Sequence, residues 1–78
     1  MNQLWQESKG EPFWRFQTDS KEIIQKLKKR DDFHLTSTGD IAVFCCNFTN
    51  PAIARGVFKA ITGFKPEIDK EGVYFTNQ

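Results

Sequence analysis

The chain has 78 residues, of which 38% are hydrophobic and 14% aromatic, and its formal net charge is +1. This length predicts one domain, and the supply of large aromatic side chains argues against a disordered chain. The balanced charge gives no global reason to expect binding to nucleic acid or to an acidic membrane surface.

Neither an export signal nor a membrane span is visible in the sequence. Met1 to Gly10 lacks an apolar stretch, and no apolar run approaches the roughly 18 residues that span a bilayer. Cys45 and Cys46 are adjacent, so they cannot form a disulfide framework, and free thiols are typical of a reducing compartment. We therefore expect a cytoplasmic protein that does not bind membranes.

The first part of the chain predicts an arm, a strand and a helix. Residues 1–11 are polar apart from one apolar anchor, Leu4 with Trp5, and form an N-terminal arm that we expect to dock on its own domain. Segment 13–18, FWRFQT, is aromatic-rich and predicts a strand. A helix follows over 20–30, with an N-cap serine, an apolar stripe and a basic last turn.

The middle of the chain predicts two strands joined by a turn. Residues 33–36 form a short strand, and the sequence TSTGD over 36–40 is typical of a turn. Segment 41–48, IAVFCCNF, is apolar on both faces. Such a strand belongs in the middle of a sheet.

A second helix is predicted between Asn50 as N-cap, with Pro51 in the first turn, and Gly63 as terminator. Six residues predict a broad apolar face on this helix: Ile53, Ala54, Val57, Phe58, Ala60 and Ile61. The segment after the helix reads as a final strand or as a small hairpin, with the turn of that hairpin at Asp69 to Gly72.

Residues 12–76 therefore predict a single α+β domain in the order β-α-β-β-α-β. This order resembles the small ferredoxin-like plait, in which an antiparallel sheet carries two helices on one face. An extra C-terminal strand would come from the hairpin alternative. The RNA recognition motif is a plait family that stacks bases on sheet aromatics. TGDIAVFCCNF lacks the basic-Gly-aromatic opening of that motif, so none of its binding residues is carried over.

No constellation of residues predicts catalysis, a metal site or a cofactor. His34 is the one histidine and has no motif around it, and Cys45-Cys46 with one histidine falls short of a zinc site. The five glycines are dispersed and match no phosphate-binding loop. We expect a protein that is not an enzyme.

The basic residues are unevenly distributed and define a candidate binding surface. In a plait both helices cover the same face of the sheet, so their cations would share one outer layer with a local positive field. The candidate binding residues are these cations and the two tryptophans: Lys21, Lys26, Lys28, Lys29, Arg30, Arg55, Lys59, Trp5 and Trp14. The alternative is that the lysines form an ordinary solvated helix surface.

The predicted sheet has more apolar surface than two helices can cover. In the first strand Trp14 and Phe16 point one way, while Phe13, Arg15 and Gln17 point the other. The second face must be covered by the arm, by the extra hairpin, by a second copy of the protein or by a ligand. An exposed apolar patch of more than a few hundred Å² usually marks an interface.

Two classes of function remain. The first is a small regulatory or inhibitory protein that acts by stoichiometric binding to a protein partner or by self-association, of the kind common on phages and mobile elements. The alternative is a nucleic-acid-binding domain that uses the basic helical layer or the sheet aromatics.

Overall fold

The structure is a computed structural model that describes residues 1–68 and 74–77. Within these residues the chain forms six strands and two helices. In chain order they are β1 (Asn2–Gln6), β2 (Phe13–Thr18), α1 (Lys21–Lys28), β3 (Phe33–Ser37), β4 (Ala42–Asn47), α2 (Pro51–Thr62), β5 (Glu67–Ile68) and β6 (Tyr74–Asn77). The α+β class is confirmed.

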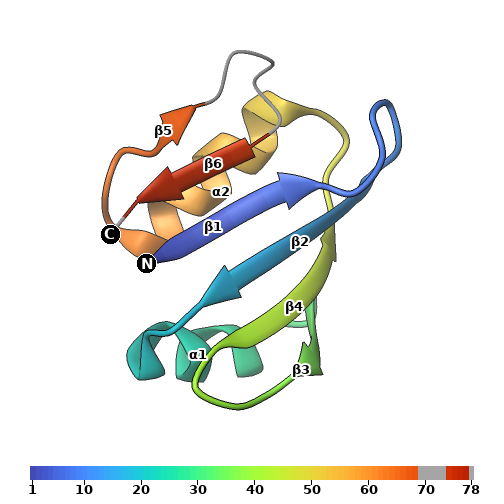
Figure 1. Ribbon diagram of the computed structural model, residues 1–78. Coiled ribbons are helices and arrows are strands. Elements are labelled where there is room, and N and C mark those ends of the chain that lie inside the picture. Colours follow the sequence, from blue (N-terminus) through green and yellow to red (C-terminus); the bar gives the residue numbers. More distant parts are fainter. Residues whose placement is uncertain (69–73, 78) are drawn as a thin grey trace.

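The strands form one antiparallel sheet in the order β3-β4-β2-β1-β6-β5. Strands that are consecutive in the chain pair as three hairpins, which lie side by side: β3 with β4, β2 with β1, and β6 with β5. Both helices lie behind the sheet in the view of Figure 1, with α2 behind β1 and β6. The described residues therefore form two layers, and neither of their helices lies on the other face of the sheet.

The sheet differs from the four-stranded plait that the sequence suggested. The segment expected in an N-terminal arm forms strand β1, which lies between β2 and β6. A plait would place the last strand directly beside the first strand of its core, which here is β2. Of the expected anchor, Leu4 docks and is buried in the core, whereas Trp5 points to the opposite face.

Local sequence signals set the start of both helices and the end of α2 as expected, whereas α1 ends at Lys28, before the expected end at residue 30. The backbone N–H of Ile23 donates to Oγ of Ser20 at 3.3 Å, and that of Ile53 donates to Oδ1 of Asn50 at 3.0 Å. Gly63 ends α2 with φ of 79°, a left-handed conformation that a residue with a Cβ rarely adopts. The hairpin alternative for the C-terminal segment is found in β5 and β6, while its expected turn at 69–72 lies outside the described residues.

The core is an aromatic cluster between the sheet and the helices. Phe16 lies at its centre and packs edge-to-face against Phe33 and Phe58, with ring centroids 6.1 and 5.8 Å apart. The core face of α2 is narrower than expected. Ala54, Phe58 and Ile61 are buried, but Ile53 is 48% exposed. Because the predicted apolar face spans too wide an arc for one helix on a sheet, one of its flanks faces solvent.

Candidate functional site

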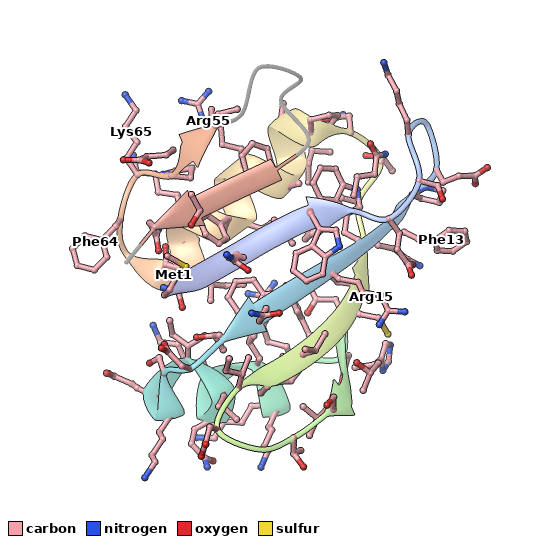
Figure 2. All side chains as sticks on the ribbon, viewed as in Figure 1. Met1, Phe13, Arg15, Arg55, Phe64 and Lys65 are labelled. Atoms are coloured by element: carbon pink, nitrogen blue, oxygen red, sulfur yellow. The ribbon has the colours of Figure 1, made fainter. Side chains whose placement is uncertain are left out.

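The helix-free side of the sheet carries the alternate residues of every long strand. We call this side the outer sheet face, and it faces the viewer in Figure 2. Its members among the described side chains are Gln3, Trp5, Phe13, Arg15, Gln17, His34, Ser37, Val43, Cys45, Asn47, Glu67 and Thr76. No described residue outside the sheet lies in a second layer over this face.

Strand register places Trp5 in the centre of the outer sheet face. Trp5 is directly opposite Arg15, which is in turn opposite Cys45, and Cys45 is opposite His34. These residues form a continuous row across β1, β2, β4 and β3. Directly opposite residues in antiparallel strands are close enough for their side chains to interact. The row therefore combines an indole, a guanidinium, a thiol and an imidazole on one surface.

A second row of the face is uncharged over its central strands. Gln3 is opposite Gln17 on one side and Thr76 on the other, and Gln17 is opposite Val43. All four side chains are half-buried. These amides and the hydroxyl offer donors and acceptors without net charge.

The charge of Arg15 is balanced within the same molecule. Its Nε donates to Oε1 of Glu7 at 2.9 Å, and the two side chains are 36% and 43% exposed. Figure 2 shows Phe13 nearer than Arg15 to the loop that joins β1 and β2. The ion pair leaves the centre of the outer sheet face close to neutral.

Trp14, one of the two candidate tryptophans, is not available to a ligand. It is fully buried, and its ring stacks on Phe75 with centroids 5.9 Å apart and lies edge-to-face on Phe48. The expectation that Trp14 could stack a nucleic-acid base is therefore wrong. Trp14 points to the helix side because it alternates with Phe13 and Arg15 along β2.

The seven candidate cations are all exposed, but two of them have partners within the fold. Arg30 forms a bidentate pair with Asp32, at 2.8 Å for both contacts, and its guanidinium lies 5.4 Å from the centre of the Phe33 ring. Hydrogen bonding to Arg30 holds the pKa of Asp32 below its ordinary value and raises the pKa of Arg30. Nζ of Lys26 donates to the carbonyl of Ile61 at 3.4 Å.

The cations do not form one shared layer. Arg55 lies near the β5 end of the sheet, far from α1 in Figure 2, and it lines a shallow cavity with Pro51 and Ile68. The expectation that both helices present their charges on one surface is therefore wrong for Arg55. Lys59 is exposed on α2. Lys21, Lys28 and Lys29 remain as an exposed basic group at α1.

The adjacent cysteines have different surroundings. Cys46 is buried, and burial is the main cause that raises its pKa to about 12. Cys45 is half-buried on the outer sheet face, and both cysteines line a cavity of about 200 Å³ with Asp32, His34 and Asn47. In the part of the chain that the structure describes, no group of three or more His, Cys, Asp or Glu side chains could hold a metal ion. The sequence did not predict that His34 and Cys45 lie opposite each other in neighbouring strands, because the register of β3 on β4 depends on the tertiary fold.

The two edges of the sheet offer little backbone for pairing. The register of β3 on β4 shifts between Leu35 and Ser37, and Oγ1 of Thr36 at this bulge donates to the carbonyl of Val43 at 3.0 Å. Bulges of this kind protect edge strands from pairing with other chains. The opposite edge, β5, has two residues. The outer sheet face is therefore the larger surface open to a partner.

Neither helix in the described ranges is long and apolar enough to cross a membrane. Comparisons with protein-family models, with curated proteins and with solved structures found no match for this chain. The arguments for a function therefore come from the surface of the molecule itself.

Proposed function

We propose that this protein is a small binding module that associates stoichiometrically with a protein partner through the outer sheet face. The observation that carries the proposal is the position of Trp5. It is half-buried in the centre of a helix-free sheet, directly opposite Arg15. Tryptophan and arginine are the residue types that most often dominate the energy of protein interfaces, and such residues cluster near the interface centre.

The composition around Trp5 supports a protein partner. Interface cores are depleted in charged residues, and apart from Glu7, which pairs with Arg15, the described neighbours of Trp5 and Arg15 on this face are glutamines, a phenylalanine and a thiol. Val43 and Cys45 add apolar area beside these amides, and exposed Phe13 stands at the margin of the face. A face of this kind favours a neutral, amphipathic partner surface over a strongly charged one.

A module with such a surface acts by binding to a surface of its target protein and thereby changing the activity of that protein. We propose a regulatory or inhibitory role of this type, in the cytoplasm and without chemistry of its own. Substitution of Trp5 then removes the activity of the protein in the cell without unfolding the domain.

Affinity capture with three variants tests the proposal. Wild-type protein, Trp5→Ala and Lys28→Gln are immobilised at equal density and exposed to a nuclease-treated extract of the source cells. Lys28 is exposed on α1, so Lys28→Gln is the matched control. We expect a protein that is retained by the wild type and by Lys28→Gln but lost with Trp5→Ala. Equal retention by all three variants would contradict the proposal.

A second candidate function is binding of nucleic acid. The observation that favours it is the exposed group of Lys21, Lys28 and Lys29, for which no ion pair is found among the described residues. Phosphate neutralisation makes such binding strongly dependent on salt. Fluorescence anisotropy of labelled oligonucleotides at about 0.05 M and about 0.15 M salt measures it. Unchanged binding after charge reversal at Lys28 and Lys29 would exclude α1 as the site.

A further inference from the structure

We propose that the outer sheet face binds a second copy of this chain, in a two-fold symmetric dimer whose axis runs along the boundary between β1 and β2. This inference rests on the proposed function, because it names the occupant of the same surface. Two sheets packed face to face lie about 10 Å apart, with their outward side chains interdigitated. The symmetry then determines which residues meet.

The register of β1 on β2 makes the face self-complementary. The axis runs parallel to these strands, midway between them and in the plane of the interface. Rotation about it places β1 of one copy over β2 of the other, with no shift along the strand direction. Trp5 and Arg15 are at equal height, so Arg15 of each copy faces Trp5 of the other. Gln3 and Gln17 are also at equal height, so each Gln3 faces a Gln17 of the other copy. Every contact occurs twice, as in any isologous interface.

The paired groups are chemically matched. A guanidinium over an indole is a cation–π contact, and it is stronger when the pair is removed from water. The hydrogen bond from Arg15 to Glu7 uses Nε, which leaves the face of the guanidinium plane open to a ring. Amide side chains such as those of Gln3 and Gln17 carry both a donor and an acceptor, so they satisfy each other across the interface.

The charge distribution selects this face for self-association. The pairing of Arg15 with Glu7 makes the centre of the outer sheet face nearly neutral, so two copies do not repel there. The opposite side of the molecule carries the exposed lysines of α1, and two copies of that surface would repel. Like-charge juxtaposition of this kind suppresses association.

The size of the face predicts a weak dimer. The six strands have two to six residues each and together cover roughly 500 Å² at ordinary strand spacing. The interface would then bury roughly 1,000 Å² in total, which is at the lower limit of specific association. The face is also more polar than an obligate dimer interface. We therefore expect a dimer that dissociates on dilution.

Sedimentation velocity of the full chain tests the dimer. Wild-type protein, Arg15→Gln, Trp5→Ala and the control Lys28→Gln are compared from about 5 μM to about 1 mM, a range that brackets weak association. We expect the wild type and Lys28→Gln to shift from monomer to dimer with concentration. Each face substitution removes two cation–π contacts and should raise the dissociation constant by at least about tenfold. Circular dichroism at low concentration checks that every variant is folded.

Two results would overturn the dimer. One is a wild-type monomer at every concentration, and the other is a dimer whose dissociation constant changes in neither face variant. The affinity-capture experiment distinguishes the absence of a dimer from the absence of any protein partner at the outer sheet face. If the wild type is a monomer but captures a different protein in a way that depends on Trp5, the outer sheet face is a docking surface and its occupant is not a second copy.

Discussion

Asn2 and Asn77 share a hydrogen bond of 2.9 Å, from Nδ2 of Asn2 to Oδ1 of Asn77, across a separation of 75 residues. The bond is one link in a chain of polar side chains. Oγ1 of Thr18 donates to Oδ1 of Asn2 at 2.6 Å, and Nδ2 of Asn77 donates to Oγ1 of Thr62 at 2.8 Å. These four residues connect β2, β1, β6 and α2, and they hold in place the strand that carries Trp5.

Asn2→Ala should lower the free energy of unfolding by about 2 kcal/mol, because it leaves the hydroxyl of Thr18 and the amide of Asn77 without their partner. Thr18 is fully buried, so water cannot replace the lost bond. Urea unfolding at low protein concentration measures the change. Gln3→Ala, one residue away on the outer sheet face, should cost about 0.5 kcal/mol or less. Equal effects of the two substitutions would contradict this account of the network.

Phe58→Ala should destabilise the protein by about 3–5 kcal/mol, because the ring is fully buried against Phe16 and its removal leaves a cavity. A loss of this size approaches the whole stability of a small domain. Ile53 lies on the solvent flank of the same helix, so Ile53→Ala should cost less than about 1 kcal/mol. Thermal unfolding compares the two variants. Greater damage from Ile53→Ala would mean that α2 turns a different face to the sheet.

The two thiols should react at very different rates. Cys46 is buried and its pKa is raised to about 12, so almost no thiolate is present near neutral pH. Cys45 is only half-buried and lies on the outer sheet face. With native protein and a thiol reagent at neutral pH, we expect one fast reaction that Cys45→Ser abolishes. Two fast reactions, or one that survives in Cys45→Ser, would contradict the structure.

The raised pKa of Cys46 also predicts a loss of stability in alkali. The ordinary thiol pKa is 9.0, and in the folded protein it is about 12. The unfolded chain therefore releases this proton first, so the contribution of Cys46 is complete below pH 9.0 and is lost as the pH rises toward 12. Urea unfolding between these limits should be less pH-dependent in Cys46→Ala than in the wild type. Identical pH profiles would contradict the burial of this thiol.

Asp32 should titrate below its ordinary pKa of 3.8 because it accepts two hydrogen bonds from Arg30. A depressed pKa contributes stability above the ordinary value, and this contribution is lost as the pH falls through the folded value. The pair is exposed, so its contribution is at most about 1 kcal/mol. NMR titration should show the pKa of Asp32 returning toward 3.8 in Arg30→Gln. An unchanged titration would exclude the pair.

Local signals in the sequence predicted the helices and the two central strands of the expected plait. Ser20 and Asn50 are capping residues whose hydrogen bonds are local, and the alternation of segment 13–18 follows from strand geometry alone. The opposite orientations of Trp14 and Arg15 were also predicted and are confirmed by the register. These features need no knowledge of distant contacts.

Strand β1 could not be predicted from local signals, because its sequence NQLWQ places a buried asparagine where a strand facing a core normally carries an apolar residue. Asn2 is tolerated there only because Asn77 and Thr18 satisfy it. Both partners depend on the tertiary fold. For the same reason the sequence identified Trp5 as a candidate but not the residue opposite it, Arg15.

Site-specific photo-crosslinking tests the docking role of the outer sheet face most directly. A photoreactive phenylalanine analogue is placed at Gln17, on that face, or at Gln25, which is exposed on α1. After irradiation in cells, we predict an adduct with a polypeptide from Gln17 and none from Gln25. The mass of the adduct distinguishes a second copy from a different protein. An adduct from Gln25 alone, or from neither position, would contradict the assignment of the outer sheet face as the docking surface.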